Sequence, residues 1–153
     1  MSMSLRVAEV TNEHVTRVAA KMRQMDLREI RGSCGENVLP KNVIKHSCRL
    51  SEFTFSVIDK KDKAIAIAGI VVGPDRKIGI PWVLATDELY EYKRELLCMG
   101  RDFLRIMEYS CEMLQNHVCT ENEKSIRWLK RLGFEFTEPY EAMNGEMFRM
   151  FYR

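Results

Sequence analysis

The chain of 153 residues lacks the features that would place it outside the ordinary globular class. No apolar run approaches about 20 residues, so no membrane-spanning helix is expected. The net charge is only +2, from 24 basic and 22 acidic side chains, which argues against general binding to nucleic acid or to a membrane surface. The N-terminal stretch MSMSLRVAEV lacks a signal-peptide pattern.

Paired cysteines and clustered metal ligands are also missing. The five cysteines are odd in number and contain no C-x-x-C pair, which favours reduced thiols in a cytoplasm. Only three scattered histidines occur, so no dedicated metal site is expected. What is present is an ordinary globular composition, 46% apolar and 30% charged, which predicts a single domain over residues 1–153.

Hydrophobic periodicity changes several times between the helical period and the strand period of two. The elements expected from it are a strand over 5–10, a helix from Thr11 or Asn12 that continues to about Gly32, a helix from Pro40 to about Leu50, strands over 53–57, 64–72 and 78–86, a long helix from Glu88 or Tyr90 to Leu114, a strand over 114–119, a helix ending at Gly133, and strands over 135–137 and 147–151. Pro81 lies within the 78–86 strand and predicts a bulge or an edge there.

The segment before Gly133 has the clearest local signals for a helix. Thr120 and Glu123 have capping-box spacing, and Asn122 is an alternative cap. Ile126, Leu129 and Leu132 then fall on one helical face, and Gly133 supplies the left-handed residue that ends it.

This segment, Asn122-x-x-Ser125-Ile126-x-x-Leu129-x-x-Leu132-Gly133-Phe134, resembles the closing motif of the GNAT (Gcn5-related N-acetyltransferase) superfamily, Asn-x-x-Ala-Ile-x-x-Tyr-x-x-Leu-Gly-Phe. It departs at Leu129, where those enzymes often carry the tyrosine that protonates the departing thiolate. The expected element order also agrees with that superfamily. The resemblance implies an α/β (α+β) GNAT-like fold, with a mixed, mostly antiparallel sheet flanked by helices.

The resemblance further implies an acetyl-CoA site at the start of the long helix. In the superfamily, main-chain N–H groups of an Arg/Gln-x-x-Gly-x-Gly/Ala loop bind the pyrophosphate there. The positions that correspond are Arg94, Leu97, Met99, Gly100 and Arg101, with Ala85 and Thr86 on the preceding strand and Asn122 in the closing motif. Arg94 fits this pattern, whereas side chains at 97 and 99 would crowd the phosphates.

Candidate bases for an amine acceptor are Asp87 and Glu88, at the end of the 78–86 strand. Their alternative role is to stabilise the N-terminus of the long helix. A second charged set, Arg23, Asp26, Glu29 and Arg31, would bind a charged acceptor if its helix lines the cleft. Its alternative role is a solvated helix face of i,i+3 ion pairs.

A narrower resemblance is to the GNAT-like internal virion protein A family of short-tailed bacteriophages. The segments that carry it include Met22-Arg23-x-x-Asp26-x-x-Glu29-Ile30, Pro81-Trp82-x-Leu84-Ala85-Thr86-Asp87, and Ser125-Ile126-Arg127-Trp128-Leu129-Lys130. It implies a phage origin and a setting in the host cytoplasm, with the virion as a further location.

Two functions remain open. The first is a catalytically degenerate phage protein that binds a phage or host protein in assembly or host takeover. The alternative is an active acyl-CoA-dependent N-acetyltransferase that acts on a small-molecule or protein amine. A homodimer is compatible with either function, and the sequence identifies neither the acceptor nor the partner.

Overall fold

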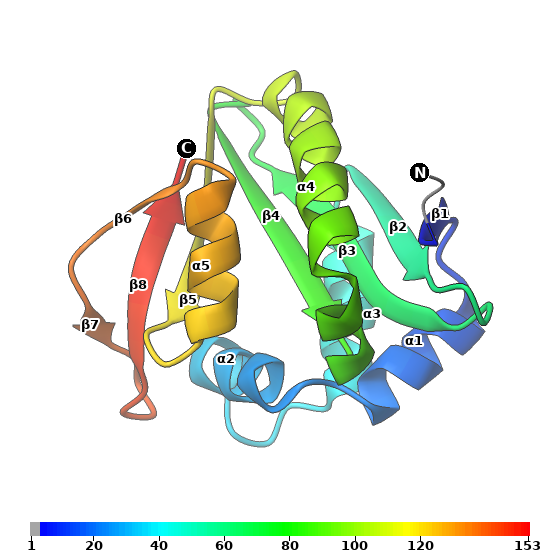
Figure 1. Cartoon of the computed structure of the whole chain (residues 1–153). Coiled ribbons are helices and arrows are strands. Elements are labelled where there is room, and N and C mark those ends of the chain that lie inside the picture. Colours follow the sequence, from blue (N-terminus) through cyan, green and yellow to red (C-terminus); the bar gives the residue numbers. More distant parts are fainter. Residues whose placement is uncertain (1–3) are drawn as a thin grey trace.

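The computed structural model describes residues 4–153 and contains an eight-stranded sheet between two helical layers (Figure 1). Residues 1–3, the start of the stretch in which no signal-peptide pattern is expected, lie outside the described residues. The strand order is β1-β2-β3-β4-β5-β8-β6, with β7 also paired to β8. The strands are β1 (Arg6–Ala8), β2 (Phe53–Ile58), β3 (Ala64–Val72), β4 (Ile78–Ala85), β5 (Met113–Cys119), β6 (Glu135–Phe136), β7 (Tyr140–Glu141) and β8 (Met147–Tyr152).

The helices divide between the two faces of this sheet (Figure 1). Helices α1 (Asn12–Ala20), α2 (Gln24–Cys34) and α3 (Pro40–Leu50) cover one face. The 3₁₀ helix η1 (Asp87–Tyr92) leads into α4 (Lys93–Glu108), which covers the other face with α5 (Glu123–Arg131). None of the helices in residues 4–153 is long and apolar enough to span a membrane.

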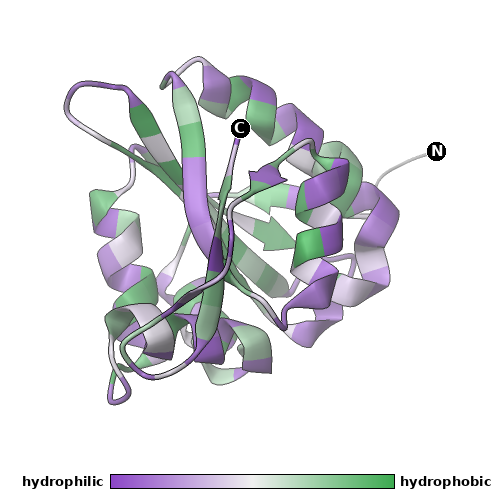
Figure 2. Ribbon diagram, turned by 90° about the vertical axis from the view of Figure 1, so that its left-hand side faces the viewer, coloured by the Kyte–Doolittle hydropathy of each residue, from purple (hydrophilic) through white to green (hydrophobic). Residues whose placement is uncertain are grey.

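The core lies on both faces of the central strands. Val18 of α1, Ile44 of α3 and Ile67 of β3 are each fully buried on the first face. The β3 run of small and β-branched residues is buried for most of its length, as expected for a strand covered on both sides. Figure 2 shows the inner strands as mainly apolar and the helices as alternating between apolar and polar residues.

The parallel strands β4 and β5 separate soon after they meet. They pair only through Ile78 with Met113 and Gly79 with Leu114, and then diverge. Across the gap, the Asn116 side chain donates a hydrogen bond to the carbonyl of Pro81 at 2.7 Å. Pro81 therefore sits where β4 has no ladder partner on the β5 side, so its missing N–H removes no ladder bond. The strand carries no bulge here, but the expected partial edge is confirmed.

The expected single helix from 11 to 32 is two helices. The chain breaks after α1 because Met22 forms an isolated antiparallel bridge with Thr86 at the end of β4. The Arg23 N–H also donates to the carbonyl of Ala85 at 2.9 Å. The break thus comes from a tertiary contact, which the apolar periodicity of the segment does not encode.

The long helix also differs from its expected bounds. Its first part is the 3₁₀ helix η1, and α4 ends at Glu108, well before Leu114. Leu114 is buried in β5, so the apolar positions after α4 belong to a strand rather than to a helical stripe. Thr120 and Asn122 are the two residues expected to cap the N-terminus of α5. The N-cap is Asn122, whose side chain accepts a hydrogen bond from the Ser125 N–H.

Candidate functional site

A cavity of ≈ 780 Å³ opens where β4 and β5 diverge. Val43 and Ser47 of α3 line it on one face of the sheet, and Phe103 and Met107 of α4 line it on the other. Because α3 and α4 cover opposite faces (Figure 1), the cavity passes through the sheet between the two strands. Two ligands that approach from opposite faces could meet in this gap.

The edge of β4 offers main-chain groups to the cavity. The Thr86 N–H donates to the Ile65 carbonyl at 2.9 Å. This bond and the strand register identify the residues of β4 whose main-chain groups form hydrogen bonds with β3. By the alternation of an antiparallel ladder, the main-chain groups of Pro81, Val83 and Ala85 point the other way, into the gap. Those of Ala85 are used by Asp26 and Arg23 of the α2 segment, at 2.9 Å each. The N–H and C=O of Val83 face the open cavity.

Asp26 forms a buried ion pair with Arg23. The two residues are 2% and 7% exposed, and the carboxylate accepts from Nε and Nη2 of Arg23 at 2.9 Å each. Burial raises the pKa of the Asp26 carboxyl, while Arg23 and the Ala85 N–H oppose that rise. Both oxygens of this carboxylate thus accept hydrogen bonds from the chain itself, which indicates a structural role.

Glu29 lies one turn after Asp26 and faces the other strand. Its Oε2 atom accepts from the Cys119 N–H at 2.7 Å and from the Asn122 side chain at 3.2 Å. Burial raises the pKa of Glu29 to about 7, and the negative charge of Asp26 adds to the effect. Among the described residues, none makes a salt bridge with Glu29. A carboxyl group with a pKa near neutrality that lines a cavity is suited to general-base chemistry.

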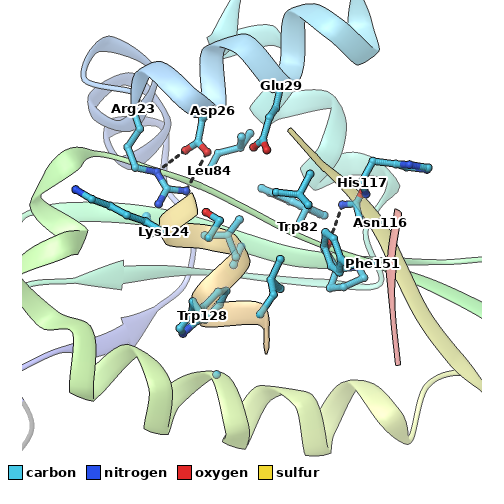
Figure 3. A pocket seen from close by; sticks show the side chains of 18 of the residues that line it. Arg23, Asp26, Glu29, Trp82, Leu84, Asn116, His117, Lys124, Trp128 and Phe151 are labelled. Atoms are coloured by element: carbon cyan, nitrogen blue, oxygen red, sulfur yellow. Dashed lines mark hydrogen bonds and ion pairs between the residues drawn. The ribbon is translucent and has the colours of Figure 1, made fainter. Parts of the chain in front are cut away.

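Figure 3 shows Asp26 and Glu29 of α2, and Arg23 just before this helix, pointing into the cavity opposite Lys124 and Trp128. Asn122 connects the two sides, because its Oδ1 caps α5 and its Nδ2 holds Glu29. This residue is 2% exposed, so its side chain is committed to these two contacts.

Basic side chains gather where α4 and α5 begin. Lys93, Lys124 and Arg127 all line the cavity, and the Lys124 Nζ lies 4.0 Å from the centre of the Tyr90 ring. A smaller cavity of ≈ 330 Å³ adjoins this region and shares Tyr90, Lys124 and Arg127 with the first. Two helix N-termini and three cations at one end of the cavity favour an anionic group there.

The two bases expected from the sequence lie in different surroundings. Asp87 is exposed and lines only the smaller cavity. Glu88 makes an ion pair with Arg17 of α1 at 2.8 Å and accepts from the Thr86 hydroxyl at 3.1 Å. It lines neither cavity, so its position does not favour a catalytic role.

The residues expected at the pyrophosphate lie inside α4 rather than in a loop. Arg94 and Arg101 are exposed and line neither cavity. Met99 and Gly100 line the larger cavity, but a Cβ on Gly100 would come within 3.0 Å of the Trp128 ring. Gly100 therefore serves the close packing of α4 on α5. The segment that precedes α4 is the 3₁₀ helix η1, which contains no glycine.

The remaining expected cofactor residues are buried. Ala85 and Thr86 are 0% and 1% exposed, and the main-chain groups of Ala85 are taken by α2. The side chain of Leu129 is 7% exposed and packs in the core, so no hydroxyl occupies the position where the superfamily often has tyrosine.

The sequence predicts a charged cluster that contains Glu29 but does not distinguish Glu29 as a base. Arg31 of the same cluster is exposed and does not line the cavity. A further pair was missed: the Tyr140 hydroxyl lies 2.6 Å from Nδ1 of His117, and both residues line the cavity. Only the pairing of β7 and β5 with β8 brings these two residues together, which a local pattern cannot reveal.

By sequence, no family model and no curated protein matches the chain. By structure, it is similar to Ard1 from Thermoplasma volcanium, with a TM-score of 0.72, 16% identity, and coverage of 99% of this chain and 97% of that one. It is also similar to spermidine N-acetyltransferase from Vibrio cholerae in complex with CoA and spermine, with a TM-score of 0.71, 13% identity, and coverage of 98% and 95%. A third similar structure is ribosomal-protein-S5-alanine acetyltransferase from Vibrio fischeri, with a TM-score of 0.68, 16% identity, and coverage of 100% and 94%.

These similarities extend over almost the whole of each chain and concern the fold. The mixed, mostly antiparallel sheet with helices on both faces is the GNAT fold, as expected from the element order.

Proposed function

We propose that the chain is an acyl-CoA-dependent N-acyltransferase that acts on an amine. The observation that carries the proposal is Glu29, a carboxyl group with a pKa of about 7 on the wall of a cavity that crosses the sheet. An ammonium group cannot attack a thioester until it loses a proton, and a base with this pKa accepts that proton near neutral pH.

The acyl donor enters from the α4 and α5 side. Lys93, Lys124 and Arg127 provide charge for its phosphates, next to the N-termini of the two helices. The extended arm of CoA contains amides, and the N–H and C=O of Val83 are placed to pair with one of them as an added strand would.

The amine enters from the α2 and α3 side, where Glu29 takes its proton. The nitrogen lone pair then attacks the thioester carbon, a C–N bond forms, and the C–S bond breaks. The nitrogen gives up its second proton to solvent as the amide forms. The departing thiolate takes a proton, for which our candidate is the hydroxyl of Tyr140, since Leu129 has none to give. Burial raises the pKa of Tyr140, which keeps that proton in place until the thiolate appears.

The test is product formation from acetyl-CoA with spermidine, spermine and a peptide with a free α-amino group, followed by mass spectrometry. Wild-type protein should give an N-acetyl product with at least one acceptor, and Glu29→Gln should abolish it. Glu88→Gln is the matched control, because Glu88 is a carboxylate outside the cavity. Loss of product in Glu88→Gln, with normal turnover in Glu29→Gln, would contradict the assignment of the base.

A second candidate is a partner-binding protein of phage origin that works in assembly or host takeover in the host cytoplasm. Two observations favour a chain that does not bind CoA: the segment before α4 has no glycine to admit a phosphate, and the α2 segment already occupies the main chain of Ala85. Failure of acetyl-CoA and CoA to bind at millimolar concentration would favour this candidate. A homodimer fits either function. Size-exclusion chromatography with light scattering would measure the oligomeric state.

A further inference from the structure

The larger cavity continues far beyond its charged end. Lys93 and Met107, near opposite ends of α4, both line it. At about 1.5 Å of rise per residue, these two positions are about 20 Å apart along the helix axis. The α4 helix runs from the open end of the gap toward the point where β4 and β5 meet (Figure 1). The cavity therefore has a charged open end and a deep end close to the joined strands.

The deep end is lined by apolar side chains from α4, β8 and the turn after α5. These are Leu104, Met107, Leu132, Phe134 and Phe151. Each is at most 7% exposed, so they belong to the core and yet border a cavity. Protein interiors are normally close-packed, and an apolar cavity lowers stability unless something fills it.

Small side chains widen the middle and the open end of the cavity. Ala66 and Ala68 of β3 line it there, opposite Ala85 and Val83 of β4. Above them, Phe103 of α4 stacks on Phe55 of β2 with ring centres 3.8 Å apart. A helix supported by large aromatic rings over alanines leaves a gap beneath it.

We infer that the acyl donor of this protein carries an apolar acyl chain longer than acetyl, with its tail in the deep end of the cavity. The inference rests on the proposed function and names the class of donor. Phosphates, amides and ammonium groups need polar partners, and the five residues of the deep end provide none. An acetyl group contributes a single methyl, whereas a chain of six to eight carbons would fill apolar space of this kind.

The test is calorimetric titration of free CoA and of acetyl-, butyryl-, hexanoyl- and octanoyl-CoA into the full chain. We expect the dissociation constant to fall about three- to fourfold for each added methylene until the deep end is filled. Equal affinity for free CoA and all four thioesters would overturn the inference but leave the proposed function intact. Absence of binding by every CoA compound would overturn both.

A matched pair of variants locates the tail. Leu104→Phe adds bulk at the deep end and should reduce the preference for octanoyl-CoA over acetyl-CoA at least tenfold. Leu104→Met keeps the volume and should preserve the preference. If Leu104→Phe does not fold, Met107→Phe takes its place. An unchanged preference in a folded, filled variant would place the tail elsewhere and overturn the assignment.

Discussion

Asp26 and Glu29 are two carboxyl groups one turn apart on α2, and each accepts a main-chain N–H from one of the two diverging strands. Asp26 bonds to β4 and has Arg23 as a buried ion-pair partner. Glu29 bonds to β5, faces the cavity, and has only neutral donors. The difference comes from Arg23, which pairs with Asp26 in a structural ion pair. Glu29 has no such partner, and its pKa of about 7 allows its charge to change near neutral pH.

The pair also shows how α2 holds the gap open at a fixed width. One carboxylate fixes the helix to β4 and the other fixes it to β5. A base built on such a helix is positioned by the same contacts that maintain the cavity, which is how rigid elements make precise sites.

The largest expected effect is a difference in stability between a variant of Asp26 and a variant of Glu29. Asp26→Asn leaves Arg23 buried without a counter-charge and should lower the free energy of unfolding by about 3–5 kcal/mol. Glu29→Gln keeps an oxygen for the Cys119 N–H and should cost less than about 1 kcal/mol at pH 6. Urea denaturation of both variants measures the difference. Equal losses would mean that the two carboxyls share one structural role.

A smaller effect concerns the pH dependence of stability. The folded protein holds the Glu29 proton up to about pH 7, whereas an unfolded glutamate loses it near pH 4.5. Between these values the native state binds more protons than the unfolded state, so the contribution of Glu29 to stability falls as pH rises. The free energy of unfolding of Glu29→Gln minus that of wild type should therefore be larger above pH 7 than at pH 4. The expected increase in this difference is on the order of 1–2 kcal/mol. A difference that does not change with pH would contradict the raised pKa.

The smallest effect tests the contact from Asn122. Asn122→Asp keeps an N-cap for α5 but replaces the donor to Glu29 with a negative charge, which should raise the pKa of Glu29. The rising limb of the rate–pH profile should move up by about one unit. Asn122→Ser, which caps without adding charge, should move it less. If the profile of Asn122→Asp coincides with that of wild type, Asn122 does not position the base.

Much of the fold could be predicted from local patterns. The bounds expected for the 64–72 strand and the helix from Pro40 to Leu50 agree with β3 and α3, because a buried apolar run and a proline at a helix start are local signals. The break at Met22 could not be predicted, since it depends on pairing with Thr86, far away in sequence. The end of α4 was missed because the apolar residues that follow suit a strand as well as a helix.

The site was harder to predict for a related reason. The sequence places Asp26 and Glu29 in one cluster, but their roles depend on which strand edge each one meets. Counting along a family motif placed the phosphate contacts at Arg94 to Arg101, which the structure places inside α4. Glu88 looked equivalent to Asp87 by position, and only the ion pair with Arg17 separates them.

The most direct test of this account is a carbon-13 NMR titration of the glutamate side-chain carboxyls in wild-type protein and in Glu29→Gln. We expect one resonance with a midpoint close to pH 7 that disappears in the variant. If every glutamate resonance titrates below about pH 5, Glu29 is an ordinary carboxylate and is not poised as a base in the cavity.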